Sequence, residues 1–264
     1  MVVLARDIRL ALDRVSFAEE LGIAPDLWQR DLLRSAARRT LLNCCRQSGK
    51  STMAAVLALH RALYHPGSLV LCLAPALRQS QELFARVAGF YRDLGRPVAP
   101  QGERKLSLEL ENGSRIVTLP GSEKTIRGFS GVSLLIVDEA ARVEDALYYA
   151  VRPMLAVSGG RMIMLSTPFG KRGVFFEEWT SEGPAGAWER YEVPAAECPR
   201  ISEEFLEEER EALGLWWFAQ EYQCRFMDTV DQVFASEAVD RAMRADIQPL
   251  SLGGSPGEAS KGAP

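Results

Sequence analysis

The sequence of 264 residues has no apolar run as long as a membrane-spanning helix, which needs about 20 residues. Its first residues, Met-Val-Val-Leu-Ala-Arg-Asp, reach charged side chains too early for a secretory signal peptide. Hydrophobic residues still make up 47% of the chain, which is enough to bury a sizeable core. The sequence therefore predicts a globular protein that does not span a membrane.

Side chains that bind zinc are scarce. There are two histidines, His60 and His65, and five cysteines, none of them in a C-x-x-C pair. A structural zinc site usually draws its four ligands from such residues at close spacing. We therefore expect no zinc, reduced cysteines and a cytoplasmic location. The adjacent Cys44 and Cys45 are expected to pack in the core.

An excess of positive charge is also missing. Lysine and arginine total 31 against 35 aspartates and glutamates, which gives a formal net charge of −4 and a pI of about 5.5. This balance excludes a protein coated in basic surface. It leaves room for a local patch that holds nucleic acid weakly enough for the nucleic acid to slide.

One glycine is missing from an otherwise recognisable phosphate-binding loop. The P-loop pattern G-x-x-x-x-G-K-[ST] requires glycine at position 44, where this chain has Cys44, but it ends correctly in Gly49-Lys50-Ser51. Residues 39–45 are short and mostly apolar, as in a buried strand, and residues 50–63 carry apolar side chains at helical spacing. Strand, polar loop and helix follow in the order that a P-loop needs. The alternative is a plain turn before an ordinary helix.

In a P-loop, the backbone N–H groups at the start of the helix face the phosphates, and the helix dipole favours their negative charge. Gly49 would let the backbone approach closely. Lys50 would reach the β- and γ-phosphates, and the Ser51 hydroxyl would ligate Mg²⁺.

A second motif consists of two acids at the end of an apolar run. Residues 132–137 read Val-Ser-Leu-Leu-Ile-Val and are followed by Asp138 and Glu139, as in a Walker B motif. Asp138 would hold Mg²⁺ through water, and Glu139 would act as general base toward the attacking water. The alternative is a strand followed by an acidic helix cap. Because both motifs follow apolar strands, they are expected at the sheet edge where α/β proteins bind ligands.

The rest of the chain predicts an alternation of helices and strands. Asn112-Gly113 indicates a β-hairpin, Ser202 an N-cap, and Gly214 the end of the helix that Ser202 starts. The acids after Ser202 are interpreted as a solvated face. Trp216, Trp217 and Phe218 are interpreted as core or packing residues, and a base-stacking platform is the alternative. Helices are expected over 10–21, from about Pro25, over 76–95 and over 145–155, and the whole region over 202–246 is expected to be mainly helical. Strands are expected over 68–75, 106–120, 160–170 and 188–195.

Five segments together resemble the ATPase domain of the large terminase subunit, the DNA-packaging motor of tailed phages. They are WQRDLL, CCRQSGKST, TIRGFSGVSLLIVDEAA, MLSTPFG and WFAQEYQCRF. In that family the first P-loop glycine is often replaced, which removes the objection raised by Cys44. The resemblance implies an α/β P-loop NTPase fold of the additional-strand, catalytic-glutamate type, with a mostly parallel central sheet and a small helical lid. The expected domains are a P-loop ATPase core over 1–200, the lid over 201–246 and a disordered tail over 247–264.

The resemblance also implies ligands and partners. These are ATP, Mg²⁺, double-stranded DNA bound by local weak contacts, a portal protein, a small terminase subunit and a homo-oligomeric ring in the host cytoplasm. The residues from Cys45 to Thr52 would bind the nucleotide, namely Cys45, Arg46, Gln47, Ser48, Gly49, Lys50, Ser51 and Thr52.

Further roles follow residue by residue from the same resemblance. Gln29, beside Trp28, matches the segment that contacts the adenine, or else is a surface glutamine packed by a core tryptophan. Arg46 matches an arginine that senses the γ-phosphate. Ser166 and Thr167, before Pro168, match a motif that couples hydrolysis to the lid, or else cap a strand end.

One role concerns a neighbouring subunit. Arg127 lies where some members place an arginine finger that acts in trans, and Arg142 and Arg152 compete for that role. A solvated surface arginine is the alternative.

One departure from the family and two rival functions complete the expectations. Large terminases continue into an RNase H-like nuclease domain, and too little sequence follows Leu250 for one, so we expect no nuclease activity. A helicase-like or DNA-remodelling ATPase would usually need two RecA-like cores, and this chain has one P-loop. A non-hydrolysing assembly module would have no need of the intact set Lys50, Ser51, Asp138 and Glu139.

Overall fold

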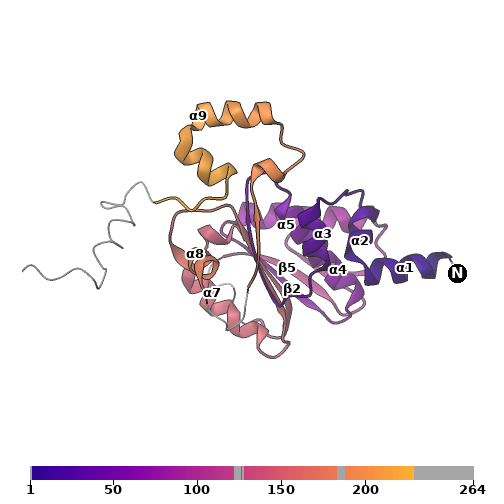
Figure 1. Cartoon of the computed structure of the whole chain (residues 1–264). Helices are drawn as coiled ribbons and strands as arrows, with labels where there is room; N and C mark the ends of the chain where they lie inside the picture. Colours follow the sequence, from indigo (N-terminus) through magenta and orange to yellow (C-terminus); the bar gives the residue numbers. More distant parts are fainter. Residues whose placement is uncertain (1, 122–125, 127, 183–187, 229–264) are drawn as a thin grey trace, which may run out of the picture. The chain divides into compact units, whose positions relative to one another are not determined.

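An eight-stranded sheet with helices on both faces organises the protein (Figure 1). The computed structural model describes residues 2–121, 126, 128–182 and 188–228. Along the sheet the strands follow the order β3-β4-β5-β2-β6-β7-β1-β8. Their bounds are β1 (Arg39–Cys44), β2 (Leu69–Ala74), β3 (Pro100–Arg104), β4 (Ser107–Leu110), β5 (Arg115–Pro120), β6 (Val132–Asp138), β7 (Arg161–Ser166) and β8 (Glu189–Val193).

The sheet is mostly parallel. Every neighbouring pair from β5 to β8 runs parallel, whereas β3, β4 and β5 pair antiparallel. In β1, β2 and β7 all residues after the first are buried, as expected for strands covered on both faces. The predicted fold class and the hairpin at Asn112-Gly113 are confirmed. Strand β7 lies between β1 and β6, and it is the additional strand that separates the two motif-bearing strands of this P-loop class.

Two apolar cores lie on the two faces of the sheet. Consecutive strand residues alternate between them, so that Leu42 packs in the first core and Leu41 in the second. The first core is covered by α1 (Val2–Leu12), α2 (Arg14–Glu20), α3 (Leu27–Arg34), α4 (Lys50–Tyr64) and α5 (Leu77–Asp93). The second is covered by α7 (Asp145–Val151) and α8 (Gly173–Thr180), with short 3₁₀ turns η1 (Ala140–Arg142) and η2 (Arg152–Leu155). This layering fixes β1, β6 and β7 side by side and brings their carboxyl ends to one edge.

The first helical prediction is wrong in two respects, the first being that α1 already begins at Val2 rather than at Leu10. The segment predicted as a single helix over 10–21 is divided at Asp13, which caps α2 by accepting hydrogen bonds from the backbone N–H groups of Val15 (3.0 Å) and Ser16 (3.2 Å). An aspartate that satisfies free N–H groups favours a new helix start over a continuous helix. Strand β3, helix α8 and the short turn η3 (Ala195–Glu197) were not predicted from sequence pattern.

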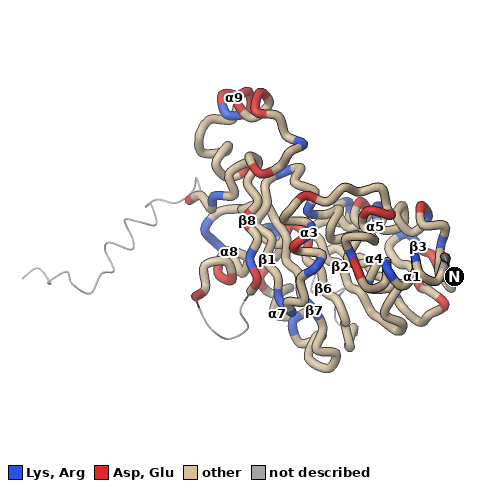
Figure 2. The backbone as a smooth tube through the Cα atoms, turned by 45° about the vertical axis from the view of Figure 1, so that its right-hand side comes forward, with Lys and Arg blue, Asp and Glu red and all other residues tan. Residues whose placement is uncertain are grey.

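Helix α9 (Glu203–Tyr222) behaves partly as predicted. The Ser202 side chain caps it by accepting a hydrogen bond from the Phe205 N–H at 3.2 Å, and the backbone leaves the helical region at Gly214, with φ 71° and ψ 166°. The acids of its first half are mostly exposed, and Figure 2 shows them gathered on this helix. Helical structure resumes after Gly214 and ends at Tyr222. The rest of the predicted lid, from residue 229 to 246, and the tail over 247–264 lie outside the described residues.

The three aromatic residues after Gly214 do not all pack in the core. Phe218 is buried together with Tyr222, one helical turn later, whereas Trp217 is 47% exposed. Adjacent positions on a helix point about 100° apart, so the face that buries Phe218 turns Trp217 outward. Phe218 therefore packs in the core, whereas Trp217 packs edge-on against the ring of Trp216, with centroids 4.6 Å apart.

Cysteine burial follows the expectation. All five cysteines are free and buried, and Cys44 and Cys45 are fully enclosed in the first core. Among the described helices, none is both long and apolar enough to cross a membrane.

A buried histidine joins the N-terminal helices to the core. His60 of α4 is 3% exposed, and its Nε2 lies 3.1 Å from the carbonyl oxygen of Leu10, to which it donates a hydrogen bond as a neutral imidazole. Burial lowers the pKa of His60 to about 4, and the charge of Arg14 acts in the same direction. Protonation would place a cation among apolar side chains.

This pKa predicts acid destabilisation. Because the folded pKa lies below the unfolded value, the unfolded chain binds more protons, so the stabilisation is complete above about pH 6.5 and is lost as pH falls toward 4. The full effect is about 3 kcal/mol, of which about 2 kcal/mol falls between about pH 7.5 and 5. Urea unfolding at these two pH values should show the loss in the wild type and a smaller loss in His60→Leu. His65→Gln is the matched control and should keep most of the wild-type difference. An unchanged pH dependence in His60→Leu would contradict the assignment.

Candidate active site

A cleft of about 1120 Å³ opens at the carboxyl ends of β1 and β6. One side is formed by the P-loop and the start of α4, and the floor by Asp138, Glu139 and Arg142. Helix α5 and the segment from Arg200 into α9 complete its walls. The two motifs recognised in the sequence therefore meet in one cleft.

The P-loop runs from the end of β1 to the first residue of α4, Lys50. Gly49 has a φ of 91°, and a Cβ atom there would lie 2.8 Å from Nε2 of Gln29. A larger residue would be strained both by its backbone and by that contact. Cys44, by contrast, is the last residue of β1 and has a fully buried side chain, so its position requires neither a positive φ nor glycine. This explains in physical terms why the missing glycine does not prevent the loop from forming.

Residues of both motifs are in direct contact. Nζ of Lys50 lies 3.5 Å from Oε1 of Glu139 and donates a hydrogen bond to Oγ1 of Thr167 at 3.3 Å. The Ser51 hydroxyl donates to Oδ2 of Asp138 at 2.9 Å. The structure thus brings together the predicted phosphate-binding lysine, the two predicted magnesium ligands and the predicted base.

Asp138 is 6% exposed, and burial raises its pKa to about 6, with the neighbouring charge of Glu139 adding to the shift. Its other oxygen accepts the backbone N–H of Glu139 at 3.0 Å. Glu139 itself has φ 51° and ψ 43°, a left-handed conformation that side chains with a Cβ rarely adopt. Gln47, in the P-loop, also lines the cleft and has a positive φ of 60°. Such strain is found where the surrounding structure fixes a functional geometry.

Helix α9 is joined to the cleft by an acid. Glu221 accepts a hydrogen bond from Nε of Arg46 and lies 3.9 Å from Nη2 of Arg142. Nε of Arg142 is in turn 3.9 Å from Oε2 of Glu139, and its guanidinium lies 4.1 Å from the ring centre of Phe169. Alternating charges therefore connect the P-loop arginine, the predicted base and the second half of α9.

Gln29 is 3% exposed and supports the loop from behind. Its Nε2 donates to the carbonyl oxygen of Ser48 at 3.2 Å, and its Oε1 accepts the backbone N–H of Asp26 at 3.0 Å. Arg200 donates to the same Ser48 carbonyl at 2.9 Å and forms an ion pair with Asp26 at 2.7 Å. Gln29 and Arg200 thus both donate to the Ser48 carbonyl and fix the P-loop backbone at this residue. The predicted adenine contact of Gln29 stays a prediction.

Of the other predicted residues, Cys45, Ser48 and Ser166 lie close to the cleft without lining it, whereas Thr52 lines it. The Cys45 side chain lies in the core, 3.7 Å from the sulfur of Cys198, and its N–H donates to the Val193 carbonyl at 2.9 Å. Ser48 is fully buried. Ser166 is also buried, and its hydroxyl donates to the carbonyl of Thr167 and accepts the N–H of Ala141. Thr52 lines the cleft, and its hydroxyl accepts a hydrogen bond from Arg86 at 2.6 Å.

The three arginines considered for action in trans are separated by the structure. Arg142 belongs to the cleft of its own chain. Arg152 lies with Arg38 and Arg39 in a groove near the amino ends of β1 and β7, at the opposite edge of the sheet. Arg127 lies outside the described residues. Sequence reasoning missed Glu221 and Arg200, although the acid within the apolar stretch WFAQEYQCRF was an available signal.

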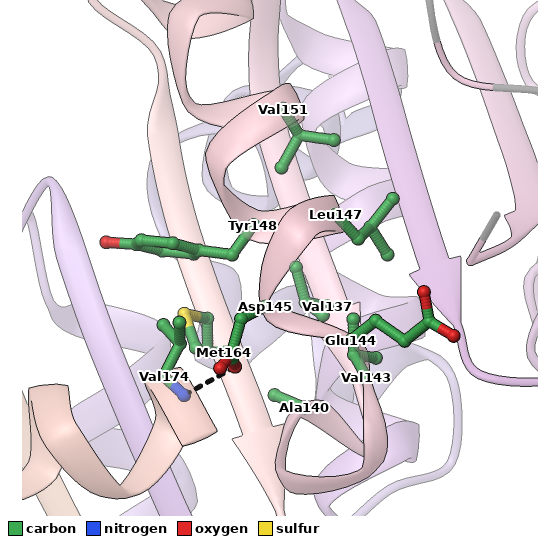
Figure 3. Close-up of a pocket in the computed structure, with 10 residues that line it drawn as sticks. All are labelled: Val137, Ala140, Val143, Glu144, Asp145, Leu147, Tyr148, Val151, Met164 and Val174. Carbon is green, nitrogen blue, oxygen red and sulfur yellow. Dashed lines mark hydrogen bonds between the residues drawn. The ribbon is translucent and has the colours of Figure 1, made fainter. Parts of the chain in front are cut away.

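A second hollow near the Walker B strand is too small to bind a nucleotide. Its volume is about 10 Å³, close to that of one water molecule, and it lies between α7 and the ends of β6 and β7 (Figure 3). Asp145 accepts the backbone N–H of Val174 at 2.8 Å at its edge, which joins α7 to α8. This packing supports the turn that carries Glu139.

Comparison with known proteins agrees with this geometry. A family model described as "Terminase large subunit, T4likevirus-type, N-terminal" matches residues 41–241. The large terminase subunits of Thermus phage G20c and Thermus virus P23-45 are each 32% identical over 174 residues, which is 58% of this chain and 36% of theirs. The match thus spans about a third of the length of these curated relatives.

A solved structure shares the fold. The ATPase domain of the Thermus phage P74-26 large terminase is 26% identical to this chain, with a TM-score of 0.70, over 80% of this chain and 97% of that domain. The family model, the sequence relatives and this structure all point to the same protein family, and the chain belongs to the terminase large subunits, whose N-terminal domain it matches over residues 41–241.

Proposed function

We propose that this chain hydrolyses ATP as the motor domain of a terminase large subunit and thereby drives double-stranded DNA into a procapsid. The observation that carries the proposal is the convergence of Lys50, Ser51, Asp138 and Glu139 in one cleft at the carboxyl edge of the sheet. This set provides a cation for the phosphates, oxygen ligands for a metal and a carboxylate for the attacking water. The G20c, P23-45 and P74-26 proteins, named as terminases, support the packaging role.

Ser51 and Asp138 fit a magnesium ion. Both offer oxygen atoms, and Mg²⁺ is usually held by one or two carboxylates together with substrate phosphates. The buried carboxylate of Asp138 accepts hydrogen bonds from a hydroxyl and a backbone N–H, and a cation beside it would offset the cost of its burial. A bound Mg²⁺ would neutralise charge on the phosphates during transfer.

Glu139 is proposed as the general base. It is paired with Lys50 at 3.5 Å, and a γ-phosphate would compete for that lysine. The carboxylate is then free to take a proton from water. The same phosphate would attract Arg46 and Arg142, which both contact Glu221 of α9. Its binding would therefore change the ion pairs that hold α9. We therefore propose that α9 begins the lid, and that Thr167, in contact with Lys50, belongs to the coupling motif.

Because the chain belongs to the terminase family, the proposal also includes two partners, the portal protein and the small terminase subunit. It further includes assembly into a ring and a location in the host cytoplasm. The helicase-like alternative has no observation of its own in the described residues. The non-hydrolysing alternative is disfavoured because Glu139 is held in a strained conformation beside the lysine.

Steady-state hydrolysis tests the proposal. Purified protein is expected to release phosphate from ATP only when Mg²⁺ is present, and faster when linear duplex DNA and the portal partner are added. Chelation of Mg²⁺ by EDTA is the control. Unwinding of a forked duplex would favour the helicase-like alternative. Absence of turnover under every one of these conditions, by protein that still binds ATP, would favour the assembly module.

A further inference from the structure

The two long walls of the cleft differ in chemistry. The α5 wall presents Gln79, Glu82 and Arg86 together with Leu83, and Arg86 donates a hydrogen bond to the Thr52 hydroxyl beside the P-loop at 2.6 Å. A second wall, formed by the segment before α9 and by α9 itself, presents Ile201, Phe205 and Tyr222 together with Arg200 and Ser202. The aromatic rings of the second wall suit a nucleobase, and on the α5 wall it is Arg86, beside the P-loop, that suits the phosphates.

Phe205 is 43% exposed although it lies within the cleft. Its ring is held edge-on against Tyr222, with centroids 6.2 Å apart, and the Tyr222 hydroxyl is fixed by Glu209 at 2.8 Å. Its backbone is fixed as well, because its N–H donates to the capping Ser202 hydroxyl at 3.2 Å. An aromatic ring that is positioned in this way and open to solvent on one side has a free face for stacking.

Arg200 provides a second flat surface beside the P-loop. Its guanidinium is anchored to Asp26 and to the Ser48 carbonyl, and Nη2 lies 3.7 Å from the position of a Cβ on Gly49. The side chain is nevertheless 47% exposed and lines the cleft. A guanidinium plane fixed at its edge can still stack on a base through its face.

We propose that the base of the bound nucleotide stacks on the aromatic wall formed by Phe205, with Arg200 as the neighbouring stacking surface. The inference rests on the proposed function, because it requires that the P-loop holds the phosphates of the same nucleotide. Gln29 then acts from behind, since its amide is already bonded to Ser48 and Asp26. Residues of α9 and of the segment before it therefore recognise the base. A movement of α9 would then change the affinity for the nucleotide directly.

The test compares a ligand that has a base with one that lacks it. Binding of Mg²⁺–ATP and of Mg²⁺–tripolyphosphate is measured by calorimetry for the wild type, Phe205→Ala and Phe205→Tyr. Loss of a stacked base is expected to weaken ATP binding by at least about five-fold in Phe205→Ala. Tripolyphosphate binding should stay at the wild-type value, and Phe205→Tyr should restore ATP binding because it keeps the ring.

Trp217→Ala is the matched control, since Trp217 is an aromatic residue of the same helix with similar exposure, 47% against 43%, and does not line the cleft. It should bind both ligands as the wild type does. Unchanged ATP binding in Phe205→Ala, or equal weakening of both ligands, would overturn the stacking proposal while leaving the proposed function intact. A wild type that binds neither ligand would overturn the proposed function and this inference with it.

Discussion

Glu139→Gln is expected to bind ATP with Mg²⁺ nearly as the wild type does and to hydrolyse it about 10²- to 10⁴-fold more slowly. The amide has the shape of the carboxylate, so the cleft around Lys50 keeps its form, but the amide cannot take a proton from water. The measurement pairs single-turnover hydrolysis with the affinity for a fluorescent ATP analogue.

Lys50→Ala is expected to fail at the earlier step. Lys50 is 8% exposed and is the first residue of α4, the helix end at which the phosphates are proposed to bind. Loss of a charge-assisted hydrogen bond there should weaken binding by about 10- to 100-fold. Lys105→Ala, an exposed lysine between β3 and β4, is the control and should bind normally. Equal loss of binding in the Lys50 and Glu139 variants would refute this division of roles.

The site could be predicted from the sequence where chemistry is local. Gly49-Lys50-Ser51 and Asp138-Glu139 each follow an apolar run, and parallel strands bring such carboxyl ends to one edge whatever the loops between them do. The missing glycine also proved harmless for a local reason, because Cys44 still belongs to β1.

The rest of the site depends on contacts between distant segments. Glu221 meets Arg46 across 175 positions of the chain, and Arg200 meets the Ser48 carbonyl across 152. Hydrophobic periodicity does not reveal such pairings, because Arg46, Glu221 and Arg200 look like ordinary charged residues of their own segments and every residue offers a backbone carbonyl like that of Ser48. The division at Asp13 was missed, and the side to which Trp217 turns was not predicted, because caps and helix rotation depend on one or two residues within longer patterns.

Mixing two inactive variants is expected to restore activity if an arginine acts across a ring interface. A positioned arginine contributes about 10³- to 10⁵-fold to hydrolysis, so Arg127→Ala should be nearly inactive alone, as should Glu139→Gln. In a head-to-tail ring, an Arg127→Ala subunit keeps its own Glu139 and receives Arg127 from a Glu139→Gln neighbour. About a quarter of the sites in a random equal mixture would then be complete.

The structure supplies a control for this experiment. Arg142 lies 3.9 Å from Glu139 of the same chain, so Arg142→Ala and Glu139→Gln damage the same site, and their mixture should regain nothing. Arg152 lies at the other edge of the sheet, and Arg152→Ala should keep most of its activity alone. The wild type should gain specific activity as its concentration rises, because the arginine must come from a neighbour. If activity recovers in the Arg142 mixture but not in the Arg127 mixture, Arg142 is the arginine that acts in trans. If activity recovers in neither mixture and specific activity does not depend on concentration, each chain hydrolyses ATP alone.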